Sequence, residues 1–153
     1  MNCHLTYVMS RGDVPYNYGE DGLDSYEDTT DTDLATGTGA SFKEALEAAL
    51  AALPKGLASL FAEFDSYDLD DETKAKEKAL YQEAVDSLRS EGWEFQGWAF
   101  QKTIAKYNWG TTRWSIIFDE GDFNSPDWNA LDCELVKDPT TVPSLLAALK
   151  GAA

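Results

Sequence analysis

The chain has 153 residues, of which 43% are apolar and 12% aromatic, which excludes an intrinsically disordered protein and allows one domain with a buried core. Asp and Glu outnumber Lys and Arg by 28 to 12, so the formal net charge is −16. Such a surface repels nucleic acid and anionic membranes, and it attracts basic proteins and divalent cations.

The compartment is inferred from what the chain lacks. No apolar run approaches the roughly 18 residues of a membrane span, and the N-terminus has no basic start followed by an apolar segment. Two cysteines, Cys3 and Cys133, fit a reducing compartment, although one disulfide between them remains an alternative. We therefore expect a cytoplasmic protein without a membrane segment.

The first predicted element is a strand over residues 2–10. Cys3, Leu5, Tyr7 and Met9 alternate with polar residues, which is typical of a strand with one buried face. The only histidine, His4, falls on the other face, and we expect it to be a surface or edge residue rather than a metal ligand.

Residues 11–40 are predicted to form a long acidic connection rich in Gly, Asp and Thr. A segment of 30 residues without structure is unusual inside a compact domain, so it is functional, flexible, or contains a short hairpin around its tyrosines. Its part 16–33 contains seven acidic residues, three tyrosines and no Lys or Arg.

Two helices are predicted next. Ser41 and Glu44 form a capping box at the start of the first helix, which Pro54 and Gly56 are expected to end. One apolar face of that helix is formed by Phe42, Ala45, Leu46, Ala49, Leu50 and Leu53. A second short helix is indicated by the same spacing in Leu57, Leu60, Phe61 and Phe64.

The segment 65–72 is a second acidic cluster, and it leads into a third helix over about 71–90 that Gly92 ends. Negative charge is favourable at a helix N-terminus, so Asp70, Asp71 and Glu72 have a structural explanation as well as a functional one.

The C-terminal part changes to β character. Residues 93–107 and 111–118 are predicted to form a hairpin around a turn at 108–110, with Trp114, Ile116 and Phe118 on one side. A loop at 119–129 is the third acidic cluster, residues 130–136 alternate as a further strand, and 140–150 form a closing helix. The predicted order β-α-α-α-β-β-β-α gives a single α+β domain over residues 1–153, with an antiparallel sheet of about four strands and helices on one face.

Motifs for catalysis and cofactors are weak. Both possible EF-hand registers, starting at Asp31 and Asp68, lack the required Gly and Glu. The stretch 36–41 lacks the lysine of a P-loop. We expect no cofactor, no metal site and no enzymatic activity, and we expect the cysteines to be buried and inert.

The mixture of acids and tyrosines favours binding to Lys and Arg on another protein, by ion pairs and cation–π contacts. The sequence predicts a non-enzymatic inhibitor that occupies the basic nucleic-acid-binding surface of a protein partner. As a class, it resembles the acidic nucleic-acid mimics that phages use against restriction or CRISPR effectors. The predicted partner-binding residues are Tyr16, Tyr18, Asp21, Asp24, Tyr26, Glu27, Asp28, Asp31, Asp33, Asp65, Asp68, Asp70, Asp71, Asp119, Glu120 and Asp122.

Three alternatives remain. The first is an immunity protein that neutralises a basic nuclease toxin. The others are a metal-dependent enzyme and a general acidic domain from a high-salt cell. Nine Lys against three Arg weigh slightly against the last alternative.

Overall fold

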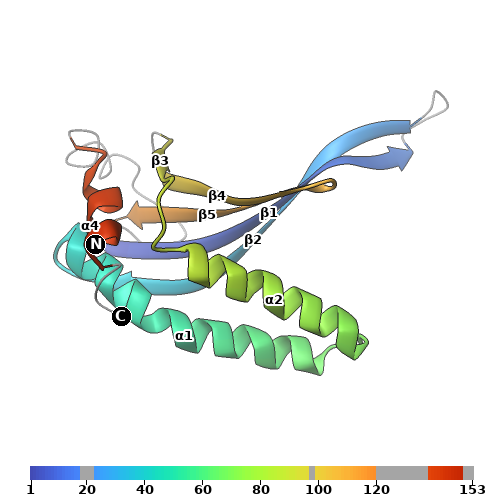
Figure 1. Ribbon diagram of the computed structural model, residues 1–153, viewed down its shortest axis with the longest axis horizontal. Coiled ribbons are helices and arrows are strands. Elements are labelled where there is room, and N and C mark those ends of the chain that lie inside the picture. Colours follow the sequence, from blue (N-terminus) through green and yellow to red (C-terminus); the bar gives the residue numbers. More distant parts are fainter. Residues whose placement is uncertain (18–22, 97–98, 120–137, 150–153) are drawn as a thin grey trace.

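The computed structural model describes residues 1–17, 23–96, 99–119 and 138–149. The elements are β1 (Asn2–Asn17), β2 (Leu23–Thr38), α1 (Phe42–Ser66), α2 (Asp71–Ser87), β3 (Glu94–Phe95), β4 (Ala99–Tyr107), β5 (Gly110–Asp119) and α4 (Thr141–Leu149). The five strands form one antiparallel sheet in the order β2-β1-β5-β4-β3, and the helices pack on one side of it (Figure 1). This confirms the predicted α+β class, with helices on one face of an antiparallel sheet. The predicted element order was wrong, because β2 was not predicted and the predicted strand 93–107 is divided into β3 and β4.

The prediction of an irregular connection over residues 11–40 was wrong, because most of it is strand, and the alternative of a hairpin around the tyrosines is the one that the structure bears out. β1 pairs with β5 only as far as Arg11, opposite Gly110, whereas its pairing with β2 continues to Asn17. The hairpin therefore extends past the sheet as a two-stranded ribbon (Figure 1). Both strands are polar on much of their surface, so the alternation that indicates a strand is hidden, although β2 is rich in Thr, which favours strands.

The hydrophobic core lies between the sheet and the helices. The predicted inward residues of two strands are confirmed, since Cys3, Leu5, Trp114, Ile116 and Phe118 are all buried. α1 and α2 contribute Phe42, Ala45, Leu46, Ala49, Leu53, Leu57, Tyr81 and Ala84 to the same core. The Trp114 Nε1 donates a hydrogen bond to the Ala84 carbonyl at 2.7 Å, which fastens α2 to β5.

Helix α1 is continuous where two helices were predicted. Ser41 is the N-cap as expected, and its Oγ accepts from the Glu44 N–H at 3.2 Å. The return bond differs from that of a capping box, because Glu44 Oε2 accepts from the Ala40 N–H, one residue before the N-cap, at 2.8 Å. Pro54 lies inside the helix without ending it. A proline inside a helix costs about 3 kcal/mol, and the burial of Leu53 and Leu57 on either side of Pro54 offsets that cost.

By length and composition alone, α1 is apolar enough to cross a membrane, although no such segment was expected from the sequence. Six of its side chains, from Phe42 to Leu57, are buried in this fold and form the face of α1 that packs into the core.

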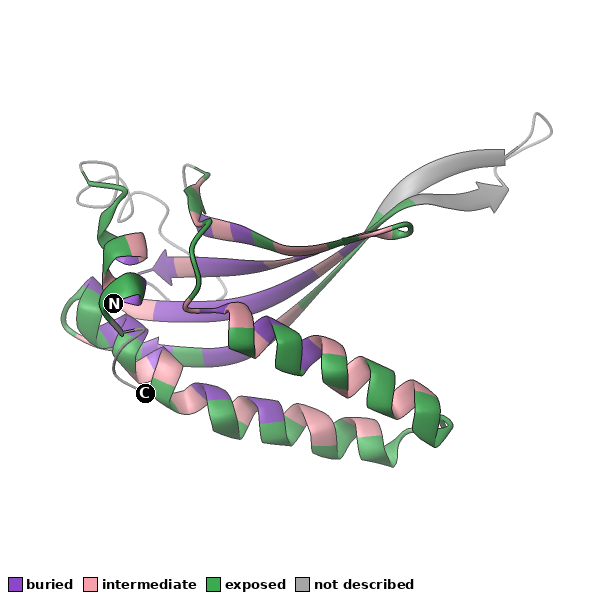
Figure 2. Ribbon diagram, in the orientation of Figure 1, coloured by how far each residue is buried: buried purple, intermediate pink, exposed green. Residues whose placement is uncertain are grey.

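The β4–β5 hairpin and the closing helix α4 are confirmed, and α2 begins at Asp71 as predicted. The predicted strand 130–136, with Cys133, and the acidic residues Glu120 and Asp122 lie outside the described residues. Burial is concentrated near the N-terminus and the start of α1, and it falls toward the far ends of the helices (Figure 2).

Candidate functional site

Two hairpins project toward the same end of the long axis of the molecule (Figure 1). We call this the distal end and define it by the ribbon, residues 11–17 and 23–28, and by the helical turn, residues 63–72. The opposite, proximal end holds the N-terminus, α4 and Asp119, the last residue of β5.

The helical turn contains six acidic residues and no Lys or Arg, namely Glu63, Asp65, Asp68, Asp70, Asp71 and Glu72. Some of this charge is structural. Asp70 is the N-cap of α2, and its carboxylate accepts from the Thr73 N–H at 2.7 Å, which lowers its pKa. Asp65 accepts from Lys78 Nζ at 2.6 Å, and this contact lowers its pKa too. Asp68 and Asp71 are exposed.

The acidic residues of β2 lie on both faces of the sheet. Asp28 is opposite Arg11, and both line a cleft on the helix side. Asp31 and Asp33 are opposite Val8 and Thr6, so they share the other face, where Thr6 Oγ1 donates to Asp33 Oδ1 at 2.6 Å.

The remaining predicted residues of the ribbon are only partly described. Tyr16, Asp24, Tyr26 and Glu27 lie within the strands, but their side chains are outside the described part. Tyr18 and Asp21 lie outside the described residues altogether.

Exposed apolar side chains accompany the distal charge. Tyr67 and Leu69, in the helical turn, are 43% and 44% exposed, and Trp109, in the β4–β5 turn, is 37% exposed. Trp109 stacks on Tyr107 with ring centroids 4.7 Å apart, and the Arg11 guanidinium carbon lies 5.5 Å from the Trp109 centroid. Aromatic groups beside charge are typical of protein interfaces.

Two predictions at the proximal end were wrong. His4 is buried rather than a surface residue, and Asp119 is buried at the end of β5 rather than exposed in an acidic loop. Their side chains contact each other, with 2.5 Å between His4 Nε2 and Asp119 Oδ2. We therefore exclude Asp119 from the partner-facing residues.

The His4–Asp119 pair belongs to a hydrogen-bonded network across three strands. A carboxylate only accepts, so Nε2 carries a proton, while Nδ1 lies 3.2 Å from the Thr36 hydroxyl. Asn2 Nδ2 also donates to Asp119 Oδ1 at 3.2 Å. The network joins β2, β1 and β5 and satisfies polar groups on the face away from the helices, which is a structural role. Sequence analysis missed it because the partners are 115 residues apart.

In the part of the chain that the structure describes, no group of three His, Cys, Asp or Glu side chains is placed to hold an ion. Cys3 is buried, as predicted, and burial raises the pKa of its thiol, so it is unreactive.

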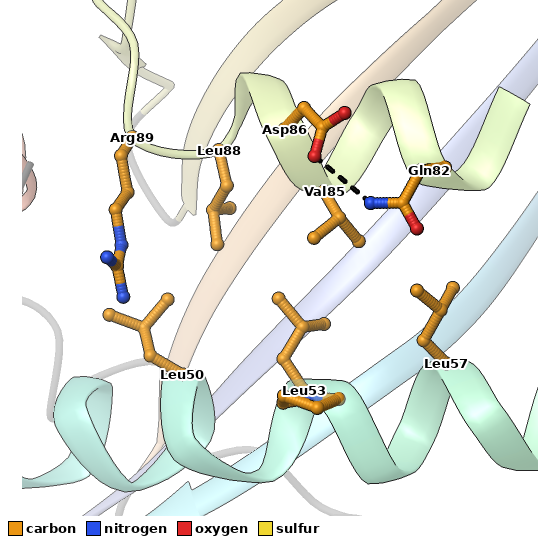
Figure 3. A pocket seen from close by; sticks show the side chains of 9 residues that line it. Leu50, Leu53, Leu57, Gln82, Val85, Asp86, Leu88 and Arg89 are labelled. Atoms are coloured by element: carbon orange, nitrogen blue, oxygen red, sulfur yellow. Dashed lines mark hydrogen bonds between the residues drawn. The ribbon is translucent and has the colours of Figure 1, made fainter. Parts of the chain in front are cut away.

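Two clefts adjoin the helices. The larger, about 460 Å³, lies between α1 and α2, where Leu50, Leu53 and Leu57 face Val85 and Leu88 (Figure 3). Its rim holds Gln82, which donates to Asp86 at 3.0 Å. The smaller, about 290 Å³, lies nearer the distal end, between β1, β2 and the helices.

Comparison with known proteins gave no relatives, since no protein-family model, no curated protein and no solved structure matches this chain.

Proposed function

We propose that the protein is a non-enzymatic inhibitor that binds, through its distal end, the basic nucleic-acid-binding surface of another protein. The observation that carries the proposal is that the ribbon, which holds part of the first acidic cluster, and the helical turn, which holds the second, are far apart in the sequence and extend toward one end of the molecule (Figure 1). Asp31 and Asp33 lie outside this end, in the body of the sheet. Carboxylates held on two separate arms can contact Lys and Arg residues that otherwise hold phosphates.

The exposed Tyr67, Leu69 and Trp109 support the same proposal. Charge pairs set the rate and specificity of encounter, whereas buried aromatic and apolar anchors supply most of the affinity of a typical interface. The distal end offers both kinds of group, and its helical turn is fixed by the Asp70 cap and the Asp65–Lys78 ion pair.

The test compares two variants that remove the same charge. The distal variant carries Asp24→Asn, Asp28→Asn, Asp68→Asn and Asp71→Asn, and the control carries Glu47→Gln, Glu83→Gln, Glu91→Gln and Glu94→Gln at exposed positions elsewhere. Each is used as bait in a cell lysate, with mass spectrometry of the retained proteins. We expect wild type and control to retain the same basic nucleic-acid-binding protein and the distal variant to lose it.

The captured protein is then titrated in a nucleic-acid-binding assay. A competitor must occupy its site, so inhibition should saturate near one equivalent and weaken as salt rises. Equal capture by both variants, or full inhibition at about one-hundredth of an equivalent, would contradict the proposal and favour an enzyme.

A further inference from the structure

The segment 29–33 of β2 lies at a margin of the sheet, and we call it the open edge. Among the described residues, β2 has a neighbouring strand on one side only, which is β1 (Figure 1). Four of the five side chains of the open edge are exposed, and Thr32 is half-buried. This stretch of strand is therefore accessible from solvent.

The open edge presents backbone groups that the fold leaves unused. In antiparallel pairing, the residues of a strand alternately direct their N–H and C=O groups toward the partner strand and away from it. Within the part of the chain that the structure describes, no backbone hydrogen bond outside the β1–β2 ladder involves residues 29–33. The outward groups can therefore pair with an extended peptide that adds to the sheet as a strand.

The sheet and α1 fix the position of the open edge. The residues of β1 opposite it, 6–10, are also paired with residues 111–115 of β5, so the open edge belongs to the sheet and not to the two-stranded ribbon. It ends at Leu34, an extra residue of β2 without a partner in β1. There α1 lies against β2 so closely that a methyl group on Gly56 would be 1.7 Å from the Leu34 carbonyl oxygen. A preformed edge loses little entropy when a strand is added to it.

The side chains of the open edge determine which strand fits it. Asp31 and Asp33 share the face away from the helices, whereas Thr30 and Thr32 lie on the helix side. Side chains directly opposite each other on paired strands attract when their charges are opposite and repel when they are alike. The strand that fits therefore carries Lys or Arg at every second position and uncharged, β-branched residues between them. The same rule disfavours a second copy of this acidic strand.

We propose that the open edge binds an extended basic segment of another protein, which adds to the sheet as a further strand beside β2. The backbone of that segment pairs with the outward N–H and C=O groups, and its basic side chains at alternate positions contact Asp31 and Asp33. The open edge is separate from the distal end, so this inference goes beyond the proposed function and does not depend on it.

The experiment titrates the isotope-labelled full chain with the acetylated and amidated peptide Lys-Thr-Lys-Thr-Lys-Thr and follows the titration by NMR. We expect the amide signals of residues 29–33 to shift, with a dissociation constant on the order of 100 μM at low salt. At saturation, every second amide of this segment should exchange with solvent about tenfold more slowly, because its N–H is bonded to the peptide instead of water.

Two further peptides distinguish strand pairing from general charge attraction. One is N-methylated on its lysine residues and the other on its threonine residues, so each loses the donors along one of its two edges. A strand that is added to a sheet margin pairs through one edge, so one of these peptides should bind at least about tenfold more weakly than the other. Both keep the same charge, so equal affinities would mean that the contact is only electrostatic and would overturn the inference.

Variants of the protein identify the side chains involved. Asp31→Asn combined with Asp33→Asn should weaken peptide binding about tenfold. Glu47→Gln combined with Glu83→Gln removes the same charge from exposed positions on α1 and α2, and it should change the affinity by less than about twofold. The NMR spectrum of each free variant shows whether it is folded, and the methylated peptides test the inference on the unaltered chain.

Three results would contradict the inference directly. The first is unchanged peptide affinity in the folded variant of Asp31 and Asp33, and the second is slowed amide exchange only in other segments. The third is a dimer in sedimentation whose amides at 29–33 are already slow before peptide is added, because a second copy would then occupy the open edge.

The outcomes also separate this inference from the proposed function. Loss of partner capture by the distal variant, without peptide binding at residues 29–33, would support the proposed function and overturn the inference. Peptide binding at the open edge, without capture of a nucleic-acid-binding partner, would support the inference alone.

Discussion

The two ends of the molecule carry charge in opposite ways. At the proximal end the carboxylate of Asp119 is buried against His4 and serves the fold. At the distal end Asp68 and Asp71 are exposed, and the acids outnumber the nearby lysines. Net charge alone therefore does not locate a functional site, because an acidic residue can hold two strands together at one end of the molecule and lie on the surface at the other.

The largest difference in stability is expected between two variants, one that removes a buried tryptophan and one that removes an exposed tryptophan. Trp114→Ala should lower the free energy of unfolding by about 4 kcal/mol, because a fully buried ring and its bond to Ala84 are lost. Trp109→Ala, at the exposed β4–β5 turn, should cost less than about 1 kcal/mol. Urea unfolding measures both changes. Similar losses of unfolding free energy would mean that the β4–β5 turn is part of the stable core.

The acidic residues give the second test. Asp119→Ala should cost about 3 kcal/mol, since it leaves the buried His4 imidazole without its carboxylate. Asp31→Ala, an exposed acid on the same sheet, should change the stability by less than about 0.5 kcal/mol. Thermal and urea unfolding of the two variants measure these changes. An Asp119→Ala variant with unchanged unfolding free energy would show that the His4–Asp119 network does not stabilise the fold.

The third prediction concerns the stability of the protein at alkaline pH. It depends on Tyr7, which is part of the core and lines the smaller cleft. Its pKa is raised to about 12 in the folded protein and is about 10 in the unfolded chain, so the folded state holds the proton more tightly. Stability is therefore present below pH 10 and falls as pH rises to 12, by about 2–3 kcal/mol from this residue. Urea unfolding between pH 9 and 12 should show a shallower decline for Tyr7→Phe, and an equal slope would refute the assignment.

The smallest expected change in stability distinguishes two acidic residues of the helical turn, one that caps a helix and one that lies on the surface. Asp70→Ala should lower the free energy of unfolding by about 1 kcal/mol, because the N-cap of α2 is lost. Asp68→Ala, two residues earlier and exposed, should be close to neutral. Equal losses would mean that the cap contributes nothing beyond general charge.

Local patterns predicted much of the fold. Ser41 and Glu44 located the start of α1, and alternation placed Trp114, Ile116 and Phe118 inside. Pairing across long separations was not predictable, as with the His4–Asp119 contact. Pro54 was wrongly predicted to end the helix for a related reason. The free-energy cost of a proline inside α1 is offset by packing against the sheet, which no local sequence pattern describes.

The candidate site was predicted only in part. Charge density identified the two distal clusters, but it could not show that Asp119 is buried or that Asp31 and Asp28 lie on opposite faces. The cleft at Tyr7 was not predicted, because its walls come from four elements.

The position of β2 at the margin of the sheet gives its acidity a second consequence. Among the described residues, one margin of the sheet is β3, which is only two residues long, and the other is β2, with 16 residues. A long unpaired margin is a template on which another chain can add a strand and begin a fibril. β2 carries Asp24, Glu27, Asp28, Asp31 and Asp33 and no Lys or Arg, so two copies approaching through this strand repel each other. The carboxylates that we propose for binding a basic partner should thus also oppose self-assembly through this strand, and their removal should increase aggregation even without a partner.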